Sequence, residues 1–104
     1  MLFAIIATDH PDRLQQRLAF RSEHRARLDA LQAEGRLLTA GPTLPDAEGD
    51  PMVTGFSGSV IIADFPSVED AQAWVNAEPY LAQGVYAQVE ILPYRETYGQ
   101  TVGK

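Results

Sequence analysis

The sequence contains no cysteine, and it contains no long hydrophobic run. The missing thiols exclude disulfide bonds, thiolate nucleophiles and thiolate-bound metal sites. No apolar stretch approaches the roughly 20 residues that a helix needs to cross a bilayer. The apolar stretch at residues 2–7 is too short for a signal-peptide core with a basic flank. We therefore expect a soluble, cytoplasmic protein that does not associate with membranes.

Basic residues are scarce as well, and their distribution is uneven. The chain has 8 lysines and arginines against 14 acidic residues, which gives a formal net charge of −6. This excess of negative charge disfavours binding to nucleic acid or to an anionic membrane surface. Six of the eight basic residues, all of them arginines, lie between Arg13 and Arg36, and residues 37–94 contain none. This concentration of positive charge needs a local explanation.

The remaining composition is that of a small globular domain, with 104 residues of which 45% are hydrophobic and 21% charged. Hydrophobic patterning, helix-start signals and turn residues predict four strands and two helices. The expected strands are residues 2–7, 36–40, 56–65 and 85–92, the expected helices are residues 13–34 and about ten residues after Ser67, and an acidic loop covers residues 42–55. The β-α-β-β-α-β order predicts an α+β, ferredoxin-like fold with an antiparallel sheet and both helices on one face. We expect one domain over residues 1–95 and a C-terminal tail at residues 96–104.

Two of the expected strands are apolar on both faces. Residues 2–7 and 60–63 lack the alternation of polar and apolar side chains that a half-solvated antiparallel strand should show. Two helices cover only one face of such a sheet, so the other face needs a different cover. We therefore expect a second copy of the chain to pack there and form a homodimer. The alternative is a sheet that simply exposes apolar side chains.

The long helix carries an unusual stripe of polar residues on its apolar side. At about 100° per residue, four leucines share one arc of the helix: Leu14, Leu18, Leu28 and Leu31. Arg17, Arg21 and His24 fall inside the same arc, spaced at i, i+4 and i+7. Burial of such groups without partners costs several kcal/mol, so we expect a polar pocket that binds a small anionic molecule. The alternative is that the arginines reach past the apolar surface into water and the histidine is an ordinary core residue.

A catalytic histidine in such a pocket needs a partner that orients its ring. Asp9, close after the first strand, is the first candidate for His24. A straight helix that begins at Pro11 would place His24 roughly 20 Å along its axis, too far for contact. Direct pairing therefore requires a non-helical stretch after Asp9, and Asp64, Glu78 or a carboxylate of a partner chain are open alternatives. Asp9 could equally act as a helix N-cap.

Hydroxyl groups complete the set of candidate site residues. Ser59, Tyr80 and Tyr86 could orient a ligand, although each is equally explained as an ordinary strand or core residue. The two histidines and the aspartates around His10 lack the regular spacing of a metal site. We therefore expect neither a bound metal nor a cofactor.

Several short motifs together resemble one protein family. They are Arg21–Leu28 (RSEHRARL), Gly35–Pro42 (GRLLTAGP), Gly55–Ser59 (GFSGS), Glu78–Tyr80 (EPY) and Gly84–Tyr86 (GVY), with Asp9 near the start. Their order over roughly residues 1–95 resembles the YciI-like (YCII-related) family. The resemblance implies a ferredoxin-like fold that pairs into a dimeric α/β barrel, and a site centred on a histidine and an aspartate, which match His24 and Asp9. Some relatives act on chlorinated aromatic breakdown products, in muconolactone-type dehalogenation or isomerisation, whereas the ending after Leu92 differs from the more basic ending expected of close relatives.

The residues and the resemblance together predict a small cofactor-free enzyme that transfers protons on a small anionic substrate, such as a muconolactone- or dienoate-like compound. His24 and Asp9 are the expected catalytic residues, because histidine exchanges protons near neutral pH. The expected substrate-binding residues, which offer cationic and hydroxyl donors, are Arg17, Arg21, Ser59 and Tyr80. The competing prediction is a noncatalytic dimer that binds a small acidic ligand or supports a partner protein.

Overall fold

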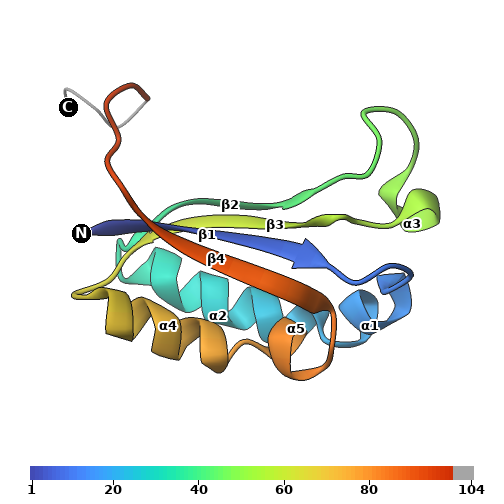
Figure 1. Cartoon of the computed structure of the whole chain (residues 1–104), viewed down its shortest axis with the longest axis horizontal. Coiled ribbons are helices and arrows are strands. Elements are labelled where there is room, and N and C mark those ends of the chain that lie inside the picture. Colours follow the sequence, from blue (N-terminus) through green and yellow to red (C-terminus); the bar gives the residue numbers. More distant parts are fainter. Residues whose placement is uncertain (100–104) are drawn as a thin grey trace.

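Four antiparallel strands form one sheet, and the two longest helices pack against one of its faces (Figure 1). This computed structural model describes residues 1–99, so the last five residues of the predicted tail at 96–104 lie outside the described part. The strands are β1 (Leu2–Asp9), β2 (Leu37–Thr43), β3 (Gly58–Asp64) and β4 (Tyr86–Tyr94). The helices are α1 (Leu14–Ala19), α2 (Arg21–Ala33), α3 (Pro51–Thr54), α4 (Val68–Asn76) and α5 (Pro79–Ala82).

The strand order is that of a ferredoxin-like fold. The sheet runs β2-β3-β1-β4, and every neighbouring pair is antiparallel. β1 and β3 form its centre, with Ile5 directly opposite Ile61, whereas β2 and β4 are the edges. Two interleaved β-α-β units of this kind place their crossover helices on the same side of the sheet. The predicted α+β, ferredoxin-like fold is therefore confirmed.

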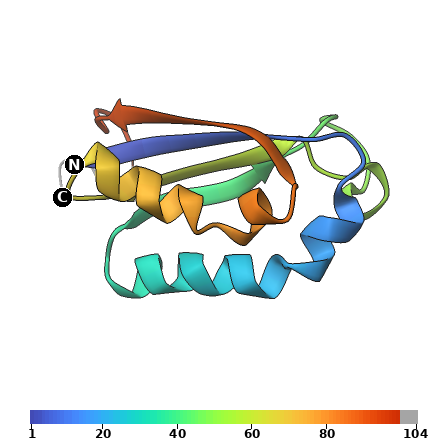
Figure 2. The ribbon, with the colours of Figure 1, turned by 60° about the horizontal axis from the view of Figure 1, so that its bottom comes forward.

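The hydrophobic core lies between the helices and one face of the sheet (Figure 2). Its buried members are Phe3, Ile5, Leu31, Ile61, Ala63, Phe65, Ala71 and Val75. Ile5 and Ile61 are each 1% exposed, and burying a side chain of this size stabilises the fold by about 1.5–3 kcal/mol. The two-residue period of the strands and the 3.6-residue period of the helices thus direct apolar side chains into one shared interior.

The opposite face of the sheet is apolar along the central strands and polar on part of β4, where Gln88 and Glu90 lie opposite Thr8 and Ile6. Helices α2, α4 and α5 all lie on the other side of the sheet from this face (Figure 1). Its side chains are the alternate members of the same strands, such as Ala4, Ile6 and Ile62. Ile6 is 37% exposed, and Leu92 of β4 is 46% exposed. The expectation that central strands are apolar on both faces agrees with this arrangement.

The predicted helix at residues 13–34 is interrupted, because the structure breaks it at Phe20. α1 ends directly before this residue and α2 begins directly after it, while Phe20 itself has φ −109° and ψ 12°, away from regular helical values. The Phe20 side chain packs against a buried cluster that includes Tyr80 and Tyr86. This tertiary packing overrides the helix-forming preference of the local sequence, and α1 leans away from the axis of α2 (Figure 2).

β2 is longer than predicted, because it continues through Gly41 and Pro42 instead of ending there. Pro42 lies opposite Ser59 of β3, and a proline is tolerated because β2 is an edge strand. The loop predicted at residues 42–55 therefore begins later, and it contains the short helix α3. The Asp50 side chain caps this helix.

The predicted start of the second long helix is confirmed. The Ser67 hydroxyl accepts a hydrogen bond from the Asp70 N–H at 3.1 Å, as in a capping box. The resulting helix α4 leads into the short helix α5 and then into β4, which runs two residues beyond the end predicted for the last strand.

Candidate functional site

A cavity of about 240 Å³ lies between α1 and α2 on one side and β2 and β3 on the other. Five of the six residues predicted to be catalytic or substrate-binding line it: Arg17, Arg21, His24, Ser59 and Tyr80. Its apolar wall comes from Leu18, Leu28, Pro42, Phe56 and Ile61. Asp9, the sixth candidate, is not part of the lining. The cavity therefore combines an apolar wall with basic and hydroxyl-bearing side chains.

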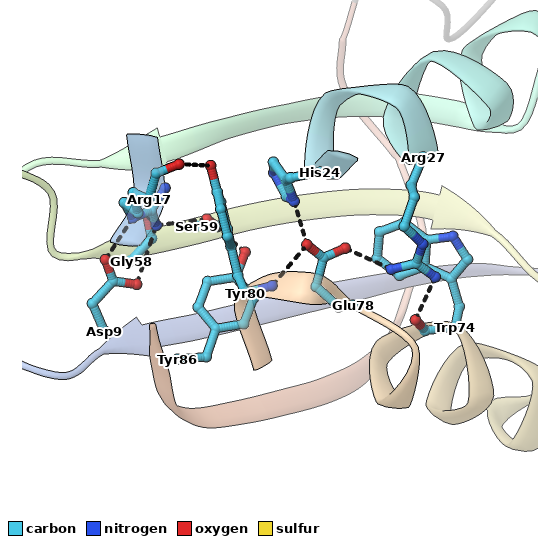
Figure 3. A network of polar contacts seen from close by, with 10 residues as sticks. All are labelled: Asp9, Arg17, His24, Arg27, Gly58, Ser59, Trp74, Glu78, Tyr80 and Tyr86. Atoms are coloured by element: carbon cyan, nitrogen blue, oxygen red, sulfur yellow. Dashed lines mark hydrogen bonds and ion pairs between the residues drawn. The ribbon is translucent and has the colours of Figure 1, made fainter. Parts of the chain in front are cut away.

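His24 forms a hydrogen bond with a buried carboxylate, and this carboxylate belongs to Glu78 (Figure 3). The His24 Nδ1 lies 2.5 Å from Glu78 Oε1, and the Glu78 side chain is 1% exposed. The other oxygen, Oε2, accepts a hydrogen bond from Arg27 Nη1 at 2.6 Å. Arg27 in turn donates to the Trp74 carbonyl at 2.7 Å and lies over the Trp74 ring. Asp9 therefore does not contact His24, and Glu78, one of the open alternatives, takes that place.

The backbone around Glu78 explains why its side chain reaches α2. Glu78 is the N-cap of α5 with an extended backbone (φ −70°, ψ 124°), and Pro79 occupies the first helical position. The carboxylate turns back over the start of the helix, where Oε1 also accepts the Tyr80 N–H at 3.4 Å. A capping carboxylate in the short link between α4 and α5 is thereby directed toward His24.

The hydrogen bond to Glu78 determines which nitrogen of His24 is free. An ionised carboxylate only accepts hydrogen bonds, so Nδ1 carries the shared proton. Nε2 has no hydrogen-bond partner within residues 1–99, and no buried side-chain nitrogen or oxygen there lacks one, so Nε2 is solvent-accessible. Because His24 lines the cavity, this nitrogen is available to a bound molecule. Arg27 balances the negative charge of Glu78, so Glu78 keeps an ion-pair partner even when the His24 imidazole is neutral.

Tyr80 supports His24 with its ring, while its hydroxyl group is used elsewhere. The two rings stack with centroids 4.2 Å apart and an interplanar angle of 18°. The Tyr80 hydroxyl donates a hydrogen bond to the Arg17 carbonyl at 3.1 Å, which connects α5 to α1. Burial raises the pKa of Tyr80 above its ordinary value, so this hydroxyl stays protonated and remains a donor at neutral pH. The hydroxyl that the sequence suggested as a ligand contact is thus engaged by the backbone.

Arg17 and Asp9 form a second buried pair (Figure 3). Arg17 Nε lies 2.6 Å and Nη2 3.1 Å from the two Asp9 oxygens, and the Asp9 side chain is 2% exposed. Arg17 Nη2 also donates to the Gly58 carbonyl at 2.7 Å and to Ser59 Oγ at 2.9 Å. Tyr86 donates its hydroxyl to the same Oγ at 2.9 Å. Asp9 therefore neutralises Arg17, whose Nη1 has no hydrogen-bond partner in residues 1–99 and remains available to the cavity.

This second pair requires a glycine at position 58. A Cβ on Gly58 would lie 2.0 Å from the Ala7 carbonyl oxygen, a distance that real side chains do not show. The missing side chain lets β3 approach β1 closely enough for Gly58 and Ser59 to reach Arg17. Burial also raises the pKa of Tyr86 well above its ordinary value. Its hydroxyl therefore remains protonated and keeps Ser59 in place.

Two arginines of this region, Arg25 and Arg27, are missing from the predicted site residues. Arg25 lines the cavity beside His24, and Arg27 reaches Glu78. The helical wheel places both at or beyond the edge of the leucine arc, so the pattern does not identify them as residues that face the interior. The charge distribution nevertheless contains a usable signal. Because residues 37–94 contain no lysine or arginine and six of the eight basic residues lie between Arg13 and Arg36, a buried acid in residues 37–94 is expected to pair with an arginine of the first helical segment.

Neither a metal-binding cluster nor a membrane-spanning helix occurs in residues 1–99. In that part of the chain, no group of three or more histidine, cysteine, aspartate or glutamate side chains could hold a metal ion. Among its helices, none has both the length and the apolar character needed to cross a bilayer.

The chain is similar to known proteins along nearly its whole length. Residues 1–95 match the YCII-related domain. Protein YciI of Escherichia coli O6:H1 is 49% identical over 98 residues, which cover 94% of this chain and 100% of that protein. An uncharacterized protein of Haemophilus influenzae is 44% identical over 98 residues, with the same coverage of both chains.

The fold is also similar to that of a solved enzyme structure. This is 5-chloro-2-hydroxyhydroquinone dehydrochlorinase (TftG) from Burkholderia phenoliruptrix, in complex with 2,5-dihydroxybenzoquinone. The match has a TM-score of 0.81 at 28% sequence identity, and it covers 91% of this chain and 94% of that chain. The match over residues 1–95 and the two bacterial relatives agree with the motifs noted in the sequence. By these similarities, the chain belongs to the YCII-related domain family.

Proposed function

We propose that this protein is a cofactor-free enzyme in which His24 transfers protons on a small anionic substrate. The observation that carries the proposal is the buried hydrogen bond between His24 and Glu78, which leaves Nε2 accessible at the cavity. Histidine is suited to exchanging protons near neutral pH, and a positioned acid or base contributes about 10²–10⁴-fold to the rate. Glu78 acts as a positioning residue, because it touches the histidine ring and is not part of the cavity lining.

In the proposed reaction, Nε2 of His24 takes a proton from the bound substrate. In an isomerisation, Nε2 returns this proton to another carbon of the same molecule. In chloride release, the C–Cl bond breaks, chloride leaves with the bonding electrons, and the proton passes from Nε2 to water. The imidazolium that forms in between carries its other proton on Nδ1, 2.5 Å from the Glu78 carboxylate. This carboxylate stabilises the positive charge, and Arg27 holds the carboxylate through its second oxygen. The stacked Tyr80 ring restricts the orientation of the imidazole.

The size and lining of the cavity support a ring-sized substrate. An apolar cavity of about 150 Å³ can hold benzene, and the cavity here measures about 240 Å³. A lactone, a dienoate or a six-membered ring with few substituents fits this volume. We propose that Arg17, Arg21 and Ser59 contact the polar groups of such a molecule, because all three line the cavity. The similarity to a dehydrochlorinase that acts on a chlorinated hydroxyhydroquinone supports the same class of ring compound.

The remaining candidates act through other residues in this proposal. Asp9 orients Arg17 through two hydrogen bonds and does not line the cavity, so we assign it a positioning role in place of the expected catalytic role. Tyr80 supports the His24 ring.

We also propose that the protein acts as a homodimer. The open sheet face, with Ile6 and Leu92 exposed, suits a second copy of the chain because packing removes apolar surface from water. The cavity lies on the helix side of the sheet. Packing through the open face therefore leaves the cavity accessible.

His24→Asn tests the proposed proton transfer, because asparagine can form hydrogen bonds but cannot take up a proton near neutral pH. We expect the wild-type protein to release chloride from 5-chloro-2-hydroxyhydroquinone, or to exchange protons of muconolactone with D₂O as followed by NMR. The His24→Asn variant should lower this rate by at least about 100-fold. The matched control is His10→Asn, which changes an exposed histidine and should keep the wild-type rate.

A His24→Asn variant that is folded by circular dichroism and turns over at the wild-type rate would contradict the proposal. Equal losses in the two variants would contradict it as well. Wild-type protein that binds these compounds without converting them would indicate the noncatalytic ligand-binding domain instead.

A further inference from the structure

Two arginines beside His24 have no partner within the described part of the chain. Arg21 and Arg25 both line the cavity, and neither forms a hydrogen bond or an ion pair within residues 1–99. The other arginines of this region are all engaged: Arg13 by the Gly84 carbonyl, Arg17 by Asp9, Arg27 by Glu78 and Arg36 by Glu34. Among these six arginines, the two without a partner are therefore both at the cavity.

The position of these two charges is unfavourable in the absence of an anion. Arg21 and Arg25 are four residues apart on α2, and like charges at this spacing repel each other. Arg25 is exposed, whereas Arg21 is only partly exposed, so water screens the charge of Arg21 less than it screens the charge of Arg25. The chain has 14 acidic residues, yet none of those in the described part pairs with either arginine. An anion bound in the cavity would remove this repulsion.

Arg17 does not supply a comparable charge. Its guanidinium lies 2.6 Å from Asp9 and both side chains are buried, so the pair carries no net charge. The remaining Nη1 of Arg17 can donate a hydrogen bond to an oxygen atom of a ligand, but the negative charge of Asp9 largely cancels the attraction of Arg17 for an anion. The net positive charge in the cavity lining therefore comes from Arg21 and Arg25.

We infer that Arg21 and Arg25 together hold the anionic group of the substrate, and that they select a ring-sized carboxylate or ionised enol over its neutral counterpart. The inference rests on the proposed function in one respect, which is the use of this cavity as the substrate site. His24 lies three residues after Arg21 and directly before Arg25. An anion held by both arginines on α2 is thus anchored next to His24, while the apolar wall is left for the rest of the molecule. Arg25 becomes a substrate-binding residue, and Arg17 becomes a fixed hydrogen-bond donor.

Binding of benzoate and of its uncharged isostere benzamide tests this inference. We expect the wild-type protein to bind benzoate at least about tenfold more tightly in isothermal titration calorimetry, as charge-assisted hydrogen bonds imply. Arg21→Gln and Arg25→Gln should each weaken benzoate binding by about tenfold and leave benzamide binding unchanged. The control Arg95→Gln removes the same charge from an exposed arginine outside the cavity lining, and it should leave both affinities unchanged.

Equal wild-type affinities for benzoate and benzamide would overturn the inference. Wild-type benzoate affinity in both glutamine variants would overturn it as well, and so would an equal loss of benzoate affinity in the control Arg95→Gln. The melting temperature without ligand separates binding from folding. Because the repulsion is relieved, Arg21→Gln and Arg25→Gln should melt no lower than the wild type. If either glutamine variant melts lower than the wild type, Arg21→Lys and Arg25→Lys provide the test, because they keep the positive charge. Both lysine variants must retain the preference for benzoate over benzamide. Loss of this preference would overturn the inference.

The same variants separate this inference from the proposed proton transfer. His24→Asn keeps both arginines and should therefore keep the preference for benzoate over benzamide. If His24→Asn loses turnover while the arginine variants keep benzoate affinity, the anion site is wrong and the proton transfer stands. If the arginine variants lose benzoate affinity while His24→Asn keeps turnover, the anion site stands and the proton transfer is wrong.

Discussion

At the scale of single residues, two buried carboxylates hold three basic side chains of the helical segment. Glu78 binds His24 and Arg27, whereas Asp9 binds Arg17. A buried charge without a partner costs several kcal/mol, so neither acid can leave its partner without a large loss of stability. The Tyr80 ring contacts both groups, since it stacks on His24 and lies 4.9 Å from the Arg17 guanidinium carbon.

Glu78→Gln should destabilise the protein strongly, because the amide cannot neutralise Arg27. Breaking a buried ion pair by removing one partner costs about 3–5 kcal/mol. Arg27 is partly exposed, so we expect the unfolding free energy measured with urea to fall by about 3 kcal/mol. The control Glu48→Gln replaces an exposed acid in the loop and should change it by less than about 0.5 kcal/mol. Equal stabilities of the two variants would contradict the role of Glu78.

At the scale of elements, the site depends on the break that divides the arginine-rich segment into two helices. Arg17 on α1 meets the end of β1, and His24 on α2 meets the N-cap of α5. In one straight helix the period of 3.6 residues would fix the directions of these two side chains relative to each other. The packing of Phe20 against the cluster around Tyr80 and Tyr86 lets the two helices direct their side chains to different partners.

Gly58→Ala should disturb the contact between β1 and β3 that supports Arg17. The added Cβ would meet the Ala7 carbonyl oxygen at 2.0 Å, and forcing atoms into a packed interior costs about 1–3 kcal/mol. We expect a loss of this size in the unfolding free energy measured with urea. At Gly41 of β2 an added Cβ meets nothing within 4 Å, so Gly41→Ala is the matched control and should be nearly neutral. A Gly58→Ala variant as stable as this control would refute the argument.

At the scale of the whole molecule, the sheet separates the side that holds the cavity from a side with exposed apolar residues. The core and the cavity lie between the sheet and the helices, whereas Ile6 and Leu92 are exposed on the other face. Large exposed apolar patches are typical of interaction sites, and the proposed dimer would cover Ile6 and Leu92 on this face. A two-fold dimer formed through this face would use the same surface of both copies.

Ile6→Glu and Leu92→Glu should each convert the proposed dimer into a monomer, because a glutamate in the interface would be buried without a partner. We expect the wild type to sediment as a dimer in analytical ultracentrifugation, and both variants as folded monomers by circular dichroism. Val53→Glu is the control, since Val53 on α3 is 79% exposed and lies outside the sheet. A wild-type protein that sediments as a monomer would contradict the dimer.

The amino-acid sequence by itself determined the four strands, the two main helical segments, their order and the layered fold, together with the cationic stripe on the first helical segment. These features depend on alternation, helical period and capping residues such as Ser67, all of which act between near neighbours in the chain. Only the tertiary structure decided that His24 pairs with Glu78, 54 residues away, that Phe20 interrupts the helix and that β2 continues through Pro42. Each of these outcomes depends on which distant segments become buried together, and local patterns carry little information about such contacts.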